Sequence, residues 1–274
     1  MLERELVEAA RIAREAGRIL MDVYATDFGV AYKGASDPVT VADERANAYI
    51  VAELARLFPD DGIVAEETAD RTGAIGKRRC WYVDPLDGTK EFIAKNGEFS
   101  VMLGLAIDGF AELGVVYQPE FDKLYQGVVG VGATLVERGV SRSLSVSGEA
   151  DPSKLRLVVS RSHRDKATDT LVTKLGITSE KPSGSVGIKV GLITEQKADL
   201  YVHPSDKSSR WDACGPDAIL RAAGGVFLDL GGDRYRYEGS DVQNHRGIFA
   251  CNAASAEAVL PVAREVAKQA GLIP

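Results

Sequence analysis

The sequence has 274 residues, of which 45% are hydrophobic and 27% are charged, and its 40 acidic against 33 basic residues give a net charge of −7. This composition is typical of a globular protein with one large domain or two smaller units that share a core. No apolar stretch approaches the length of a membrane span, and the acidic N-terminus does not resemble a signal peptide, so we expect neither.

The first half begins with a pattern typical of helices, which predicts helices over 6–24 and about 43–58. Lys33–Thr40 between them is predicted to be a loop, because Gly34 and Pro38 rule out a continuing helix. Short strands are expected at 62–65 and 81–83, the latter stopped by Asp84 and Pro85, and a short helix at 89–94. An antiparallel meander should follow, with strands at 99–107, 110–117, 121–129 and 130–136.

The second half alternates strands with helices, as βα units do. We expect strands at 155–159, 199–202 and 226–230, and helices at 165–175, 185–196, 214–223 and 254–270. The polar stretch 145–153 contains Gly148 and Pro152 and is the best candidate for a boundary. We therefore divide the chain into an N-terminal α+β half, 1–148, and a C-terminal α/β half, 149–274, within a layered α/β fold.

Charge and cysteine content bear on two properties of the protein, its binding to nucleic acid and its cellular location. The nearest candidate for a nucleic-acid-binding stripe is the run Lys77–Arg79, which is short and is interpreted as a solvated loop, so we expect no nucleic-acid partner. Cys80, Cys214 and Cys251 are widely spaced and form no CxxC pair. Free thiols of this kind predict a cytoplasmic location.

The stretch WYVDPLDGT, residues 81–89, carries the clearest chemical signal. Pro85 imposes a turn that lets Asp87 swing back toward Asp84, and Gly88 and Thr89 then begin a helix with free backbone N–H groups. Two carboxylates beside such N–H groups suit a cation and a phosphate together. The alternative is a capped turn, in which Asp87 only satisfies those N–H groups, and these residues alone leave it open.

Two further acidic features strengthen the metal hypothesis. Glu66 and Glu67 follow a predicted strand, where isolated surface charge is the alternative, and Asp212 directly precedes a predicted helix, where an N-cap is the alternative. Carboxylates gathered from three element ends would repel one another unless cations neutralise them. Oxygen ligands favour Mg²⁺, with Mn²⁺ as a substitute, over zinc.

Asp84-Pro-Leu-Asp-Gly-Thr, together with Glu66-Glu67 and Trp211-Asp212, resembles the motif set of the inositol monophosphatase superfamily. The resemblance extends from Lys33 to about Cys251. The run KEFIAKNGEF, residues 90–99, resembles the CysQ branch of 3′(2′),5′-bisphosphate nucleotidases, and so do Ser160–His163 and Lys189. The resemblance implies an alternating αβαβα sandwich with an N-terminal antiparallel and a C-terminal mixed sheet. It also implies lithium sensitivity, a role in sulfur assimilation and a homodimer.

The resemblance also implies a role for each matching position. Two or three Mg²⁺ ions would be bound by Glu66, Asp84, Asp87, Asp212 and the carbonyl of Leu86, while Asp43 and Thr89 would orient and deprotonate the attacking water. The scissile phosphate would contact the N–H groups of Gly88 and Thr89, and Lys33 would lie on a mobile loop that closes over the site. The nucleotide would contact Ser160, His163, Ser185 and Lys189.

Substrate choice is less constrained than the metal site, because two positions depart from the family pattern. Ser185 stands where relatives often have glycine, and His203 stands where fungal relatives carry a phosphate-binding arginine. We predict hydrolysis of adenosine 3′,5′-bisphosphate to AMP and phosphate by metal-activated water. The alternatives are an inositol monophosphatase or fructose-1,6-bisphosphatase, both of which act on polyol phosphates, and, from another class, a non-catalytic binding protein on the same fold.

Motifs of other enzyme classes fail on their spacing. Residues 73–78, GAIGKR, are too short for a Walker A motif and lack a Ser or Thr after the lysine. Ser183–Gly187 begins with serine and is no GxSxG elbow. The three histidines lack the spacing of zinc ligands.

Overall fold

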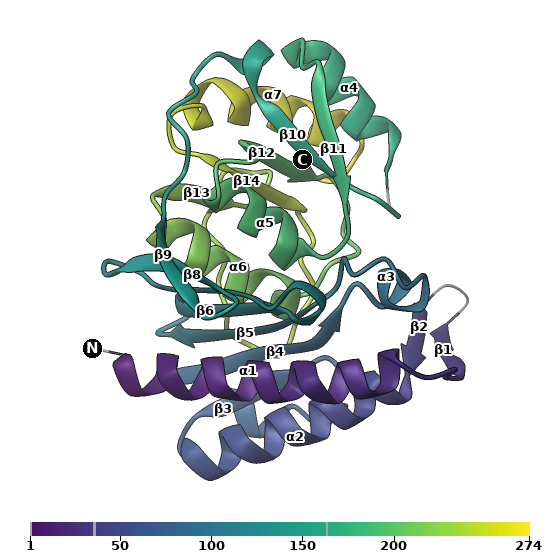
Figure 1. The fold of residues 1–274 in the computed structure, drawn as a ribbon. Coiled ribbons are helices and arrows are strands. Elements are labelled where there is room, and N and C mark those ends of the chain that lie inside the picture. The colour runs from purple at the N-terminus through teal and green to yellow at the C-terminus, as the bar shows by residue number, and fades with distance from the viewer. Residues whose placement is uncertain (1, 35–36, 163) are drawn as a thin grey trace.

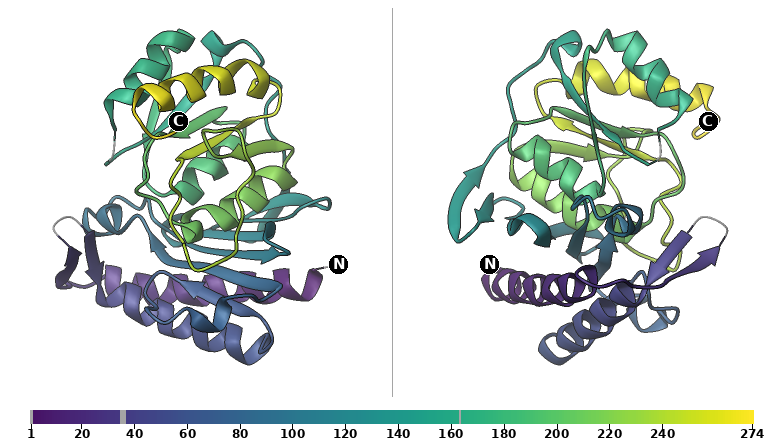
Figure 2. Two further views of the ribbon diagram at one scale, coloured as in Figure 1. Left: turned by 180° about the vertical axis from the view of Figure 1, so that it is seen from behind. Right: turned by 45° about the vertical axis from the view of Figure 1, so that its right-hand side comes forward.

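The computed structural model describes residues 2–34, 37–162 and 164–274. Its elements stack as helices, sheet, helices, sheet and helices (Figure 1). This arrangement confirms the predicted αβαβα sandwich. Figure 2 shows the same layers from two further directions, with α1 and α2 on one outer side and α4 and α7 on the other. Within the described ranges, none of the helices combines the length and apolar character needed to cross a membrane.

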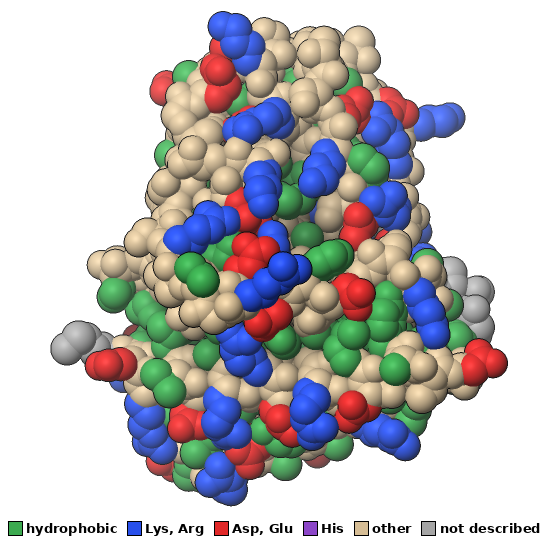
Figure 3. Space-filling model, viewed as in Figure 1, with side chains coloured by type: hydrophobic (Ala, Val, Ile, Leu, Met, Phe, Trp, Pro, Cys, Tyr) green, Lys and Arg blue, Asp and Glu red, His purple; other side chains and the backbone are tan. Residues whose placement is uncertain are grey.

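The first layer consists of α1 (Glu3–Tyr24) and α2 (Val41–Leu57). One stripe of α1 is buried because its apolar residues recur at helical spacing, as in Ala9, Ile12, Ala13, Ala16 and Leu20. The opposite faces are polar, and Figure 3 shows basic and acidic side chains interspersed there. Ion pairs along these helices include Arg18–Glu15 on α1 and Arg56–Glu53 on α2. Both predicted helices are confirmed to within three residues.

The segment between these helices is not a plain loop. It forms an antiparallel pair, β1 (Val30–Gly34) and β2 (Asp37–Thr40), on either side of residues 35–36, which lie outside the described part of the chain. The prediction of a loop was therefore wrong. Pro38 is accommodated because both strands of a two-stranded ribbon are edges, where a missing N–H disturbs no inner ladder.

A seven-stranded sheet forms the second layer, with its strands adjacent in chain order. The strands are β3 (Gly62–Ala65), β4 (Arg79–Asp87), β5 (Ser100–Ile107), β6 (Phe110–Gln118), β7 (Lys123–Val128), β8 (Gly132–Glu137) and β9 (Val140–Leu144). All pairs are antiparallel except β3 with β4. The predicted meander is confirmed. Sequence reasoning missed β9 because its residues are mostly polar and exposed.

Strand β4 corrects another prediction, since it continues through Asp84 and Pro85 to Asp87. Asp84 lies opposite Met102 and Asp87 opposite Ser100, so three steps on β4 match two on β5. The extra residue is a bulge, and a bulge tolerates proline because one backbone N–H is left out of the ladder. The bulge leads directly into the short helix α3 (Thr89–Ile93).

The middle layer contains α5 (Val186–Thr194) and α6 (Arg210–Ala222), which lie between the two sheets. Helix α6 approaches β5 and β6 closely, because Gly104 and Gly114 face Gly215 and a Cβ at either strand position would collide with the helix backbone. The predicted start of this helix at 214 was wrong by four residues, which matters for Asp212 below.

The outer sheet has the order β11-β10-β12-β14-β13 and mixes parallel with antiparallel pairs, as predicted. Its strands are β10 (Arg156–Ser160), β11 (Ser179–Ser183), β12 (Leu200–His203), β13 (Gly225–Leu228) and β14 (Ile248–Asn252), covered by α4 (Lys166–Leu175) and α7 (Ala256–Gln269). Strands β11 and β14 were not predicted. The boundary at 148/149 stays a prediction and falls between β9 and β10.

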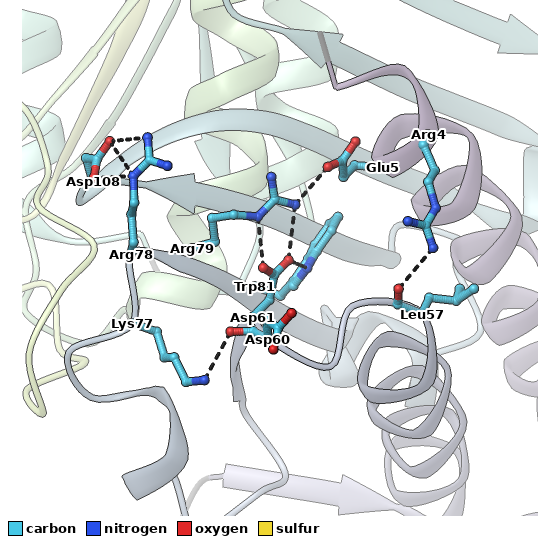
Figure 4. Close-up of polar contacts among 10 residues, drawn as sticks. All are labelled: Arg4, Glu5, Leu57, Asp60, Asp61, Lys77, Arg78, Arg79, Trp81 and Asp108. Atoms are coloured by element: carbon cyan, nitrogen blue, oxygen red, sulfur yellow. Dashed lines mark hydrogen bonds and ion pairs between the residues drawn. The ribbon is translucent and has the colours of Figure 1, made fainter.

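The basic run Lys77–Arg79 is bound to neighbouring groups and is not wholly a solvated loop (Figure 4). Arg79 begins β4, is 27% exposed, and pairs with Asp61 and Glu5, each at 2.8 Å. Arg78 binds Asp108 with two nitrogens, and Lys77 donates to the carbonyl of Asp60 at 3.0 Å. Arg79 therefore connects α1 to the sheet, which corrects the predicted role of this residue.

Candidate active site

A cavity of about 240 Å³ brings together residues from β4, α3, α5, α6 and β12. Of the predicted site residues, it is lined by Asp87, Gly88, Thr89, Ser160, Ser185, Lys189 and Asp212. A larger cavity of about 830 Å³ lies between residues 64–82 and 237–242 and is lined by none of them. We place the candidate site at the smaller cavity because the acidic residues and the buried lysine meet there.

Asp84 lies at the bulge of β4 and is 2% exposed. Its Oδ1 accepts a hydrogen bond from the N–H of Leu86 at 2.9 Å. Burial raises the pKa of Asp84 well above its usual range, and the charges of Glu66, Asp87 and Asp212 raise it further. These four acids from three separate elements therefore act on one another, as the sequence predicted.

Asp212 occupies the third position of α6 and not the position before the helix. Its Oδ2 accepts from the N–H of Ser209 at 2.6 Å and completes a capping box, which explains why the helix begins earlier than predicted. Burial and the charge of Asp87 raise the pKa of Asp212 to about 7.

Asp87 connects the turn after β4 to the C-terminal half. Its Oδ2 accepts from the hydroxyl of Ser185 at 2.6 Å and from the N–H of Gly187 at 3.2 Å. Burial raises its pKa, while the cation of Lys189 opposes that shift. The alternative in which Asp87 only satisfies the N–H groups of its own turn does not hold. Asp87 accepts instead from an N–H group at the start of α5, and among the described residues no side chain caps α3.

Glu66 follows β3, and its N–H donates to the carbonyl of Val83 at 3.1 Å, so the β3–β4 pairing continues toward Asp84. Arg71 supports this region from the outside. Its Nη2 donates to the carbonyl of Glu66 at 3.1 Å, and its guanidinium lies 4.7 Å from the ring centroid of Trp211, the neighbour of Asp212. One arginine therefore spans two of the predicted ligand positions.

The donor set at this site fits a hard divalent cation. In the described ranges, no three His, Cys, Asp or Glu side chains already converge in metal-binding geometry, and Asp84, Asp87 and Asp212 instead accept hydrogen bonds from N–H and hydroxyl groups of the protein. All the donors are oxygens, however, and burial together with neighbouring negative charge raises the pKa values of Asp84 and Asp212. A bound cation would relieve that repulsion, and oxygen donors match Mg²⁺.

Asp43 lies at the start of α2, 1% exposed. Its Oδ2 accepts from the N–H and from the hydroxyl of Thr40, each at 2.8 Å, in a capping box. Its Oδ1 accepts from the hydroxyl of Thr89 at 3.4 Å, and the same hydroxyl lies 3.3 Å from the carbonyl of Leu86. Burial raises the pKa of Asp43 to about 6. The structure thus brings Asp43, Thr89 and Leu86 together.

Two backbone conformations in the site lie in the region that favours glycine. Gly88 has φ 97° at the start of α3, where a Cβ would also press on the carbonyl of Glu98. Ser185 has φ 49° as the N-cap of α5. Ser185, which was noted above as a departure from the glycine of the family pattern, therefore adopts a strained conformation. Its hydroxyl compensates by hydrogen bonding to Asp87, to Ser100 and to the N–H of Ile188.

Lys189 is 3% exposed, and its Nζ lies 5.1 Å from the ring centroid of Tyr201. Burial lowers the pKa of Lys189, while the charges of Asp87, Glu91 and other nearby acids oppose that shift. Ser160 ends β10 at the cavity. His163 lies outside the described residues, as does the side chain of Lys33, whose backbone is in β1.

Sequence reasoning missed further residues at this cavity, namely Lys90, Glu91, Tyr201, His203 as a lining residue, Lys207 and Ser208. Glu91 belongs to the run 90–99, which was used only to choose the branch of the family. That run was the available signal, because a glutamate in a helix of five residues that directly follows the turn of Gly88 and Thr89 is seldom buried.

Comparison with known proteins now decides the family. The model of the "Inositol monophosphatase family" matches residues 2–268. The chain belongs to the inositol monophosphatase family. It is 36% identical to the 3′(2′),5′-bisphosphate nucleotidase CysQ of Escherichia coli O157:H7, over 85% of this chain and 93% of that protein. It is 29% identical to 3′(2′),5′-bisphosphate nucleotidase 1 of Dictyostelium discoideum, over 89% and 92% of the two chains.

Solved structures of inositol monophosphatase family members agree with this assignment. The crystal structure of CysQ from Bacteroides thetaiotaomicron superposes with a TM-score of 0.76 at 31% identity, over 93% of this chain and 98% of that one. The SuhB protein of Bartonella henselae shares the fold with a TM-score of 0.83 at 22% identity, over 96% and 99% of the two chains. The family inferred from the motifs is confirmed, and so is the enzyme class, a phosphoric monoester hydrolase.

Proposed function

We propose that the protein is a Mg²⁺-dependent 3′(2′),5′-bisphosphate nucleotidase that converts adenosine 3′,5′-bisphosphate to AMP and phosphate. One observation carries the proposal, namely that the carboxylates of Asp87 and Asp212 and the buried cation of Lys189 line the same cavity. A bisphosphate presents two anionic groups, so it needs both a metal site and a separate cation. The nucleotidases among the relatives support this choice.

The metal would be bound by Asp84, Asp87, Asp212, Glu66 and the carbonyl of Leu86, with Mn²⁺ as a possible substitute for Mg²⁺ and with two or three ions in all. When bound, it would supply an acidified water and positive charge beside the phosphoryl oxygens. The support is the chemistry of the donor set, because Asp84 is buried and the half-buried carboxylates of Glu66, Asp87 and Asp212 repel it without a cation.

The remaining steps belong to residues of the chain. Asp43 would accept a proton through the Thr89 hydroxyl, which its Oδ1 already contacts. The backbone N–H groups of Gly88 and Thr89, before the first hydrogen bond of α3, would orient the scissile phosphate. Ser160, Ser185 and Lys189 would contact the rest of the nucleotide, with His163 and the Lys33 loop assigned on resemblance alone.

The proposal is tested by phosphate release from a substrate panel at saturating Mg²⁺. The panel contains adenosine 3′,5′-bisphosphate, 3′-AMP, inositol 1-phosphate and fructose 1,6-bisphosphate. We expect the bisphosphate nucleotide to have the highest kcat/KM, EDTA to abolish turnover, Mg²⁺ to restore it and Li⁺ to inhibit it. A preference for inositol 1-phosphate or fructose 1,6-bisphosphate would replace the nucleotidase assignment with the corresponding alternative.

We also propose a cellular location, an oligomeric state and a metabolic role for the protein. Cys80, Cys214 and Cys251 are all free and buried, which supports a reducing compartment, and we infer a cytoplasmic location. A homodimer and a role in sulfur assimilation rest on family resemblance. Gel filtration with light scattering measures the oligomeric state directly.

A further inference from the structure

Two acidic side chains of the N-terminal half reach across to the C-terminal half beside the candidate site. The carboxylate of Glu98 accepts from Nη2 and Nε of Arg161 at 2.6 and 2.7 Å. It also accepts from the backbone N–H of Gly184 at 2.7 Å. Glu91, which is 5% exposed, accepts from the hydroxyl of Ser162 at 2.5 Å. We call these five residues the clasp.

The backbones at the clasp are packed too closely for any other residue at position 184. A Cβ there would collide with the carbonyl oxygen of Glu98 and with the side chain of Glu91. The contact between the halves is therefore built from both side-chain and backbone atoms. Arg161 is fixed further because its Nη2 also lies 3.3 Å from the carbonyl of Pro182, and its N–H donates to the carbonyl of Ser183 at 3.1 Å.

Two of the C-terminal members of the clasp, Arg161 and Gly184, are next to residues that line the site cavity. Arg161 follows Ser160, and Gly184 precedes Ser185. The clasp thus fixes two segments, 160–162 and 184–185, relative to the turn of Gly88 and Thr89. The scissile phosphate would contact that turn and the metal, whereas the rest of a nucleotide would contact the two clasped segments.

We propose that Glu98 is a positioning residue that gives the enzyme its selectivity for nucleotides, by fixing these two segments at the distance that a nucleotide spans. The inference rests on the proposed function. Glu98 touches neither substrate nor metal in this scheme. Its loss should therefore weaken binding of the nucleoside part and leave binding of the scissile phosphate unchanged.

The test compares Glu98→Gln, Arg161→Gln and the double variant with the wild type. Glutamine keeps the size of Glu98 but removes the charge-assisted pair. We expect KM for adenosine 3′,5′-bisphosphate and the inhibition constant of AMP to rise about tenfold in each single variant, the factor of one charge-assisted hydrogen bond. The double variant should be no worse than either single one, because both remove the same interaction. The inhibition constant of inorganic phosphate and kcat should stay within about threefold.

Arg78→Gln provides the matched control, since Arg78 and Asp108 form an equally two-pronged pair that is exposed and lies away from the cavity (Figure 4). It should leave all constants unchanged. If the wild type does not hydrolyse the nucleotide with Mg²⁺, the proposed function fails and the clasp inference with it. If the wild type is active but the Glu98 variants keep their KM, or lose AMP and phosphate binding equally, only the positioning role is overturned.

Discussion

The hydroxyl of Thr89 lies 3.4 Å from Oδ1 of Asp43, although 46 residues separate the two in the chain. The contact joins the start of α2 to the turn after β4. The other oxygen of Asp43 is occupied by Thr40, so the carboxylate is fixed on one side and directed toward the turn on the other. This arrangement is what a general base needs, because its proton path is set before substrate binds.

We expect Asp43→Asn to lower kcat more than it raises KM, because the proton acceptor is lost while the metal and phosphate contacts remain. The base acts unprotonated, and burial raises the pKa of Asp43 to about 6, so wild-type kcat should fall as pH decreases through that value. The acidic limb should be absent in Asp43→Asn. A pH profile of kcat with a steady-state KM measurement checks both points.

Thr40→Ala is the control for Asp43. Thr40 lowers the pKa of Asp43 through its hydrogen bonds, so removing its hydroxyl should move the acidic limb to higher pH. It should also destabilise α2 by about 1 kcal/mol, since the N-cap is lost. A predominant effect of Asp43→Asn on KM would reassign Asp43 to substrate binding.

Asp84→Asn should reduce kcat by at least about 100-fold, because a metal ligand is weakened where the ion neutralises the reacting phosphate. The fold should survive. An asparagine oxygen can still accept from the N–H of Leu86. Without metal, the Tm of Asp84→Asn should equal or exceed that of wild type, because one of several repelling charges is removed. Near wild-type turnover in a folded variant would remove Asp84 from the metal site.

Asp217 offers a test of buried charge away from the proposed chemistry. It is 4% exposed and accepts from the hydroxyl of Tyr237 at 3.0 Å. Among the described residues its Oδ1 has no hydrogen-bond partner, although Nη1 of Arg221 lies 4.0 Å away. Burial raises its pKa to about 7. Between its unfolded value of 3.8 and that pH the native state retains a proton that the unfolded state has lost, so stability falls as pH rises through this window.

Asp217→Asn removes this titration. The Tm difference between Asp217→Asn and wild type should therefore be more favourable to the variant at about pH 8 than at about pH 5.5. Asp22→Asn serves as the comparison, because it is the same substitution at a side chain that is 66% exposed. An equal Tm difference at both pH values would mean that Asp217 ionises as easily in the folded protein as in the unfolded chain.

Periodicity predicted the long elements of this fold because one physical pattern decides each of them. The apolar stripe of α1 is buried against the sheet, and the apolar runs predicted as strands form β5 and β6, which are buried along most of their length. The errors arose where a tertiary contact or a cap outweighed the local sequence signal for the end or the start of an element. Pro85 remains in β4 because a bulge absorbs it, and α6 begins at Arg210 because Ser209 and Asp212 form a capping box.

The sequence predicted part of the cavity lining but none of the contacts between its members. The motifs named the acids, yet spacing alone does not show that Asp87 caps α5 or that Asp43 reaches Thr89. Those contacts join elements that are distant in sequence and that only tertiary packing brings together. The packing of α2 against the seven-stranded sheet brings Asp43 to Thr89, and the packing of α5 between the two sheets brings Ser185 and Gly187 to Asp87. Glu98 was not predicted as a site residue for the same reason, since its partners Arg161 and Gly184 lie in the C-terminal half.

Lys189 is the predicted contact for the second phosphate of the substrate. Lys189 is buried at the cavity, and within the described part of the chain it forms no ion pair within 4.0 Å, only the contact with the ring of Tyr201. Such a cation is available to an anionic ligand. We expect Lys189→Ala to reduce kcat/KM for adenosine 3′,5′-bisphosphate by roughly 10- to 100-fold, the value of one charge-assisted contact. Substrates with one phosphate should lose much less.

Two controls separate this role from its alternatives. Tyr201→Phe keeps the ring that faces Lys189 and should leave selectivity unchanged. Lys207→Ala removes an exposed cation that lines the same cavity, and a selective loss there, with Lys189→Ala mild, would place the second phosphate at Lys207. Equal losses on both kinds of substrate in Lys189→Ala would show that the lysine supports the site by offsetting the charge of Asp87, and the nucleotidase assignment would then lose its main physical support.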